Sequence, residues 1–157
     1  MKIIKVENNK KKYLDLLLLG DEQESMIDLY LDKGDMFVAA DNGVKAECVV
    51  VKCEDRVYEL KNIAVAPEFQ RMGYGKKLVE YILSYYNDCD TMYVGTGDSE
   101  KTLNFYKACG FKESHRVKNF FVDNYDHDIY EDGIKLIDMI YLRMDLNCDQ
   151  NHADRKD

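Results

Sequence analysis

Residues Ile63–Leu78 have the types and spacing to bind an anionic ligand. A β-branched run ends at Pro67 and is followed by a glycine-containing turn that opens an amphipathic helical pattern. Backbone N–H groups in such a turn, with the positive end of a helix dipole, form a site for phosphate. Positive charge is added by Arg71, Lys76 and Lys77. The segment therefore predicts a site for a phosphorylated cofactor.

Two common phosphate-binding motifs do not fit this turn. The Walker loop requires glycine where Gln70 stands and serine or threonine where Lys77 stands. The dinucleotide fingerprint requires glycine at the position of Leu78, and a second candidate turn, Gly95-Thr96-Gly97, has Glu100 at that position. A plain turn whose glycines only relieve backbone strain remains the alternative.

A family resemblance gives the turn a more specific interpretation. The segment Gln70-Arg71-Met72-Gly73-Tyr74-Gly75 resembles the [Arg/Gln]-x-x-Gly-x-[Gly/Ala] loop of the GNAT family of N-acetyltransferases, and the strand that ends in Val65-Ala66-Pro67 resembles the family's fourth strand. A second signature is similar to Asn104-Phe105-Tyr106-Lys107-Ala108-Cys109-Gly110-Phe111. The resemblance covers residues 44–111 in motif detail and the whole chain in element order.

The resemblance implies that acetyl-CoA is the co-substrate. In the family, backbone N–H groups of the loop bind the pyrophosphate, and two central strands splay apart so that the pantetheine arm enters between them. Unpaired strand amides would suit the two amides of that arm. The cofactor site implied in this way comprises Ile63, Ala64, Val65, Gln70, Arg71, Met72, Gly73, Tyr74, Gly75, Lys76, Asn104 and Tyr106.

Acetyl transfer to an amine needs a base, an oxyanion donor and an acid for the leaving thiolate. Tyr106 matches the family tyrosine that acts as the acid; its alternative role is a half-buried aromatic covering the sheet. Glu59 matches the strand carboxylate that deprotonates the amine, and its alternation with Leu60 predicts that it points to the opposite face. A solvent-facing Glu59 or a water chain remains the alternative. The oxyanion donor is expected to be the backbone N–H of Ala64 or Val65.

The acidic segment 123–133 is a candidate acceptor site. Carboxylates interleaved with aromatic rings suit an ammonium ion, and the residues expected to line the site are Tyr125, Asp126 and Tyr130. An ordinary solvated loop is the alternative. No metal site is expected, because the segment lacks the order of a calcium loop and because Cys48 and Cys53 lack partners at zinc spacing.

Periodicity predicts a mixed sheet of the α/β (α+β) class in the order β-α-α-β-β-β-α-β-α-β-β. An Asn42-Gly43 hairpin and a right-handed parallel crossover around residues 75–86 are expected. The predicted strands are residues 2–6, 36–40, 44–52, 57–66, 91–95, 111–121 and 134–146. The predicted helices are residues 13–19, 22–33 (capped by Asp21), 75–86, and a helix that Asp98 or Ser99 caps and Gly110 ends.

The chain has 157 residues, 46% of them apolar and 33% charged, which predicts one GNAT-type domain over residues 1–146 and a polar tail over 147–157. The net charge is −8, from 22 basic and 30 acidic residues; it opposes nucleic acid and membrane partners and favours a cationic acceptor. No membrane span or signal pattern is present, and five scattered cysteines indicate a reducing cytoplasm. The apolar strand 134–146 allows a homodimer.

These observations predict an N-acetyltransferase that moves the acetyl group of acetyl-CoA to a primary amine by direct attack in a ternary complex. The acceptor is a small molecule or a peptide whose identity the sequence leaves open. Two alternatives also remain: a non-catalytic module that senses acyl-CoA, and transfer of an acyl group larger than acetyl.

Overall fold

The computed structural model describes residues 1–146, which form two compact units. The first unit comprises residues 1–53 and 59–87, and the second comprises residues 54–58 and 88–146. Strand β4 (Val57–Val65) begins in the second unit and continues in the first. The predicted polar tail, residues 147–157, lies outside the described residues.

The first unit has four neighbouring strands in the order β1-β2-β3-β4. The pairs β1–β2 and β2–β3 are antiparallel, and Asn42 and Gly43 have φ angles of 56° and 102° in the predicted hairpin between β2 and β3. Besides β4, the elements of this unit are β1 (Lys2–Val6), the 3-10 helix η1 (Lys10–Tyr13), α1 (Leu14–Gly20), α2 (Glu24–Ile27), β2 (Asp35–Ala40), β3 (Val44–Glu54), the 3-10 helix η2 (Pro67–Phe69) and α3 (Tyr74–Tyr85).

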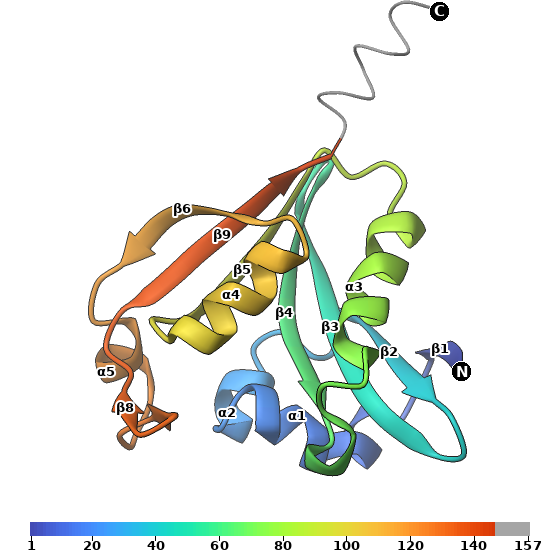
Figure 1. The fold of residues 1–157 in the computed structure, drawn as a ribbon, viewed down its shortest axis with the longest axis horizontal. Coiled ribbons are helices and arrows are strands. Elements are labelled where there is room, and N and C mark those ends of the chain that lie inside the picture. Colours follow the sequence, from blue (N-terminus) through green and yellow to red (C-terminus); the bar gives the residue numbers. More distant parts are fainter. Residues whose placement is uncertain (147–157) are drawn as a thin grey trace, which may run out of the picture. The chain divides into compact units, whose positions relative to one another are not determined.

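Helices cover both faces of β2 and β3 in this unit (Figure 1). Because side chains alternate along a strand, Met36 and Val38 pack with α1 and α2, whereas Phe37 faces α3. The Phe37 ring is fully buried, with ring centroids 5.6 Å from Tyr81 and 5.1 Å from Tyr85. Burying a side chain of this size stabilises the fold by about 1.5–3 kcal/mol.

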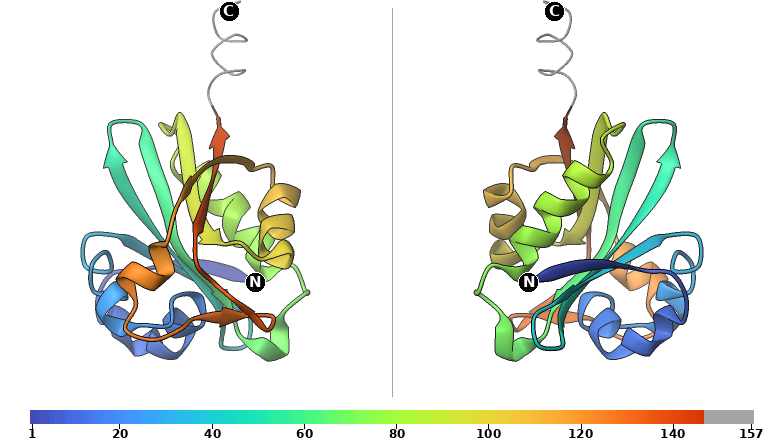
Figure 2. Two further views of the ribbon diagram at one scale, coloured as in Figure 1. Left: turned by 90° about the vertical axis from the view of Figure 1, so that its left-hand side faces the viewer. Right: turned by 90° about the vertical axis from the view of Figure 1, so that its right-hand side faces the viewer.

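The second unit has the strand order β5-β9-β6, with both pairs antiparallel, and a separate β7–β8 pair. Helix α4 packs on β5 (Figures 1 and 2). As predicted, Ser99 precedes this helix as its N-cap residue, and Gly110 follows it with a φ of 108°. The elements are β5 (Thr91–Gly97), α4 (Glu100–Ala108), β6 (Lys112–Val117), α5 (Phe120–Asn124), β7 (Tyr130–Glu131), β8 (Ile134–Lys135) and β9 (Met139–Asp145).

The helix predicted over residues 22–33 is shorter in the structure, because α2 ends at Ile27. The carbonyl groups beyond it are bonded by a distant side chain: Lys10 Nζ donates to the backbone oxygens of Leu31 at 2.8 Å and Gly34 at 2.6 Å. The prediction that Asp21 caps this helix is wrong. Gln23 is the N-cap residue, and Asp21 instead accepts a hydrogen bond from the Tyr30 hydroxyl.

Two predicted C-terminal strands are also divided. The strand expected over residues 111–121 ends at Val117, after which Asn119 adopts a φ of 60° and α5 begins. Asparagine tolerates this left-handed conformation better than most residues. The strand expected over residues 134–146 is split between β8 and β9, because Leu136 turns into a small core with Phe121 and Ile129.

Among residues 1–146, no helix is both long enough and apolar enough to cross a membrane.

Candidate functional site

The predicted phosphate-binding turn joins β4 to α3 in the first unit. Arg71 and Gly73 adopt positive φ angles of 65° and 90°, and Gly73 is the N-cap residue of the 12-residue helix α3. No side chain caps this helix end, so its first-turn N–H groups are not used by a capping residue. A Cβ atom added to Gly73 would meet no other protein atom within 4 Å. The turn therefore leaves room for an anion at the positive end of α3.

The side chains of the turn divide into charged and structural groups. Arg71, Lys76 and Lys77 are exposed. Gln70 folds back, its Nε2 donating to the carbonyl oxygen of Val65 at 3.2 Å, and the Tyr74 hydroxyl donates to Asp41 at 3.2 Å. Desolvation and the Asp41 carboxylate raise the pKa of Tyr74, which keeps its hydroxyl a neutral donor. The charges of the turn are thus available to a phosphate, while Gln70 holds its shape.

Strand β4 places the predicted base and the predicted thioester-binding main chain on one segment. Its burial alternates, so that Glu59, Ile63 and Val65 lie on a half-buried face and Leu60 and Ala64 on a buried face. The orientation predicted for Glu59 is confirmed by this alternation. The side chain of Glu59 is 16% exposed, and its Oε2 lies 3.3 Å from Lys61 Nζ. The carboxylate is therefore partly shielded and held by an ion pair.

The predicted acid lies in the second unit, on α4. Tyr106 is 6% exposed, and its ring meets Phe105 and Phe111 edge-on, with centroids 5.2 Å and 5.9 Å away. Asn104 is exposed on the same helix. Glu59 and the glycine turn thus belong to one unit, near opposite ends of β4, whereas Asn104 and Tyr106 belong to the other unit.

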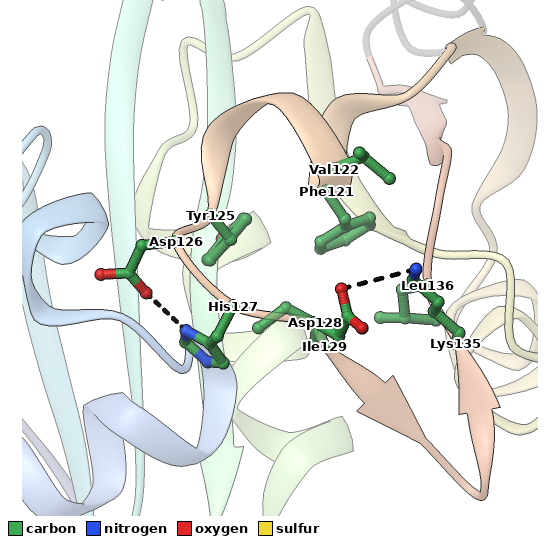
Figure 3. A pocket seen from close by; sticks show the side chains of 9 residues that line it. All are labelled: Phe121, Val122, Tyr125, Asp126, His127, Asp128, Ile129, Lys135 and Leu136. Carbon is green, nitrogen blue, oxygen red and sulfur yellow. Dashed lines mark hydrogen bonds and ion pairs between the residues drawn. The ribbon is translucent and has the colours of Figure 1, made fainter.

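The acidic segment of the second unit borders a pocket of about 110 Å³ (Figure 3). Tyr125 stacks on Phe121 with centroids 5.5 Å apart, and Asp126 lies 2.6 Å from His127. Tyr130, predicted to belong here, does not line the pocket; it is 56% exposed on β7. The lining residues are Phe121, Val122, Tyr125, Asp126, His127, Asp128, Ile129, Lys135 and Leu136.

Lys135, which sequence reasoning missed, pairs with Asp128 at 3.4 Å across this pocket. It lies on β8, opposite Tyr130 of β7. The turn between these strands is Asp132-Gly133, with φ angles of 51° and 78°. An Asp-Gly pair is a strong hairpin signal, so this hairpin could have been found from the sequence.

A second group that sequence reasoning missed is buried in the first unit. Glu47 on β3 is completely buried, and burial raises the pKa of its carboxyl well above the ordinary value of 4.5. Asn62 on β4 is 3% exposed and donates from Nδ2 to the Leu17 carbonyl oxygen at 3.0 Å and to the Tyr30 hydroxyl at 3.1 Å. One acidic residue within the apolar run Ala46–Val51 is the signal that could have identified Glu47.

Among residues 1–146, no group of three or more histidine, cysteine, aspartate or glutamate side chains is arranged to hold a metal ion.

The turn before α3, a helix start without a side-chain cap after a glycine, has the features of a phosphate-binding site in a mixed α/β protein. The chain belongs to the GNAT acetyltransferase family: the family model described as an acetyltransferase (GNAT) domain matches residues 32–113. It is 37% identical over 144 residues to a Bacillus subtilis (strain 168) protein named Uncharacterized N-acetyltransferase YvbK. The aligned region covers 89% of this chain and 92% of that protein. The predicted family is confirmed.

Solved structures agree with this assignment. A GNAT family acetyltransferase from Elizabethkingia anophelis, with acetyl-CoA bound, has a TM-score of 0.86 at 37% identity, covering 92% of this chain and 97% of that one. An acetyltransferase from Bacillus subtilis in complex with CoA has a TM-score of 0.84 at 34% identity, covering 92% and 98%. The predicted α/β fold class is confirmed by these matches.

Proposed function

We propose that this protein transfers the acetyl group of acetyl-CoA to a primary amine of a cationic acceptor, by direct attack in a ternary complex. The observation that carries the proposal is the uncapped N-terminus of α3 beside Gly73. A GNAT family protein with 37% identity holds acetyl-CoA, and one with 34% identity holds CoA. The proposed location is the cytoplasm, because the five scattered cysteines of the sequence fit a reducing compartment.

In this proposal the pyrophosphate of acetyl-CoA binds the turn between β4 and α3. First-turn N–H groups of α3 donate to its oxygens, and Arg71 and Lys76 supply positive charge. Glycine at position 73 is needed for two reasons: its φ of 90° disfavours other residues, and a side chain would fill the open space beside the turn. The pantetheine amides bind the main chain of Ile63, Ala64 and Val65.

In the proposed chemistry, Glu59 is the base and Tyr106 is the acid. Glu59 accepts a proton from the acceptor ammonium, and the amine lone pair then attacks the thioester carbonyl carbon. A C–N bond forms, and a main-chain N–H of Ala64 or Val65 stabilises the oxyanion. The C–S bond breaks as the carbonyl re-forms, Tyr106 protonates the leaving thiolate of CoA, and the extra proton on the new amide nitrogen returns to the Tyr106 oxygen, so that a neutral amide and free CoA are released. The packing of Phe105 and Phe111 fixes the ring of Tyr106 for this step.

The pocket beside α5 is the proposed place of the cationic acceptor. Its wall combines the Tyr125 ring with the carboxylates of Asp126 and Asp128, which suits an ammonium group. Asp128 is already paired with Lys135, so a cationic acceptor would replace an existing ion pair rather than meet a bare carboxylate. Tyr130 is left out of this proposal because it lies outside the pocket.

Thiol release from acetyl-CoA, measured across a panel of small amines and peptides, tests the function. We expect turnover with at least one cationic amine, and a rise in melting temperature with acetyl-CoA alone, because a ligand of the native state stabilises it. Binding without thiol release for any amine would indicate an acyl-CoA sensor. Faster turnover with a longer acyl-CoA would indicate a different acyl donor. No thermal shift with acetyl-CoA would contradict the cofactor assignment.

A further inference from the structure

Glu47 lies in the apolar layer between the strands and helices α1 and α2 of the first unit. It pairs with Val38 across β2 and β3 and therefore shares the face of Val38, which packs with Leu17, Ile27 and Tyr30. Neither of its carboxylate oxygens has a hydrogen-bond partner among residues 1–146. An ionised carboxylate in such a place would be very costly, so the group needs either a partner or a proton.

Asn62, in the same layer, also has a buried oxygen without a hydrogen-bond donor among the described residues. Its Nδ2 is used twice, toward Leu17 and Tyr30, whereas its buried Oδ1 has no donor among the described residues. The packing around this oxygen is tight, because a Cβ atom added to Gly20 would lie 2.1 Å from it. The orphaned atoms, Glu47 Oε1 and Oε2 and Asn62 Oδ1, are all acceptors.

A protonated Glu47 supplies a donor to this set of acceptors. Its O–H can donate to an acceptor of this layer, in which Glu47 interacts electrostatically with Tyr30, and a carboxylic acid costs far less to bury than a carboxylate. Tyr30 connects the group to the surface, since its hydroxyl accepts from Asn62 and donates to the half-buried Asp21 at 2.9 Å. We call Glu47, Asn62, Tyr30 and Asp21 the Glu47 cluster.

The position of the cluster along β4 gives it a role in the reaction. Asn62 immediately precedes Ile63, Ala64 and Val65, and its side chain ties this part of the strand to α1 and to the turn after α2. We propose that Glu47 and Asn62 are positioning residues that hold the main chain of Ile63–Val65 in place for the thioester, with Glu47 acting as a buried neutral acid. This inference rests on the proposed function only for the identity of the ligand.

Amide hydrogen exchange of the unliganded protein tests the structural half of the proposal. Asn62→Ala should speed exchange at Ile63–Val65 by about tenfold or more relative to the rest of β4, because two tertiary hydrogen bonds are lost. Glu47→Gln keeps a donor and should change these rates by less than about threefold. Val38→Ala is the matched control, because it removes apolar volume opposite Glu47 without touching a polar partner. Equal, uniform effects of Asn62→Ala and Val38→Ala would overturn the proposal.

Steady-state kinetics below the melting temperature of every variant test the catalytic half. Asn62→Ala should lower kcat by about tenfold or more while the KM for acetyl-CoA changes by less than about threefold, since the pyrophosphate turn is untouched. Val38→Ala should retain wild-type kcat. A wild-type kcat in Asn62→Ala would refute the catalytic role. If the wild type shows no turnover but exchange follows the expected pattern, the proposed function fails and the positioning of β4 by the cluster stands.

Discussion

Replacing Glu47 with glutamine should make the folded protein increasingly more stable than the wild type as the pH rises. Glutamine has the size of the neutral acid and cannot ionise. In the unfolded wild type Glu47 titrates near its ordinary pKa of 4.5, whereas burial keeps the folded-state pKa well above that value. The groups that interact with it are Tyr30 and Cys48, and Tyr30 in turn contacts Asn62, Asp21 and Lys61.

The sign and size of the effect follow from proton linkage. Below pH 4.5 both states of the wild type carry the proton, so the two proteins differ only by packing. Above it the folded state holds a proton that the unfolded state has lost, and wild-type stability falls by about 1.4 kcal/mol per pH unit until the folded-state pKa is reached. The variant should therefore gain stability over the wild type steadily above pH 4.5, and the gain should level off once the folded-state pKa is passed.

Urea unfolding of both proteins between pH 4 and 8 measures this difference directly. Glu54→Gln is the control, because it makes the same change at the exposed end of β3 and should shift the free energy of unfolding by less than about 0.5 kcal/mol at any pH. A constant difference between the wild type and Glu47→Gln across the range would show that Glu47 is ionised in the folded protein. The neutral-acid reasoning would then be wrong.

Other predictions concern the reaction. Tyr106→Phe should lower kcat about hundredfold, by removing the acid, with little change in melting temperature; an unchanged kcat would exclude Tyr106. Glu59→Gln should lower kcat similarly, by removing the base, and an unchanged kcat would exclude Glu59. Arg71→Ala should weaken acetyl-CoA binding, measured by calorimetry, about fivefold at low salt and less at high salt, because salt screens the exposed charge. The control Lys52→Ala should bind acetyl-CoA as tightly as the wild type. Asp126→Asn should raise the KM of a cationic acceptor but not of acetyl-CoA; equal effects on both would remove the pocket from the acceptor site.

The parts of the fold that local backbone chemistry determines were predictable from the sequence. The glycine turn, the Asn42-Gly43 hairpin and the Gly110 helix end all depend on residues that tolerate positive φ, and the structure has each one there. The early end of α2 was not predictable, because its following carbonyls are bonded by Lys10, more than twenty residues away in sequence. Long-range contacts of this kind leave no periodic pattern in the local sequence.

In the candidate site too, local features could be predicted from the sequence and long-range contacts could not. The proposed pyrophosphate turn could be predicted from one short segment, whereas the Glu47 cluster gathers side chains from β3, β4 and the helical region between β1 and β2. The acidic segment could be recognised from its composition, but the ion pairs that its carboxylates form could not. Which carboxylates meet Lys135 or His127 depends on the β7–β8 hairpin and on the packing of Leu136, and both required the structure.

The strand order of the second unit limits how a second copy could extend its sheet. Strand β9 is paired on both sides, by β5 and β6, so the strand expected to support a homodimer offers no backbone edge. The outer strand is β6, and every one of its residues is exposed. Glu113 and Arg116 on β6 are held in ion pairs with Lys107 and with Asp98 and Asp138. Another strand could add here only by desolvating those charges, so this edge protects the protein against sheet-to-sheet aggregation.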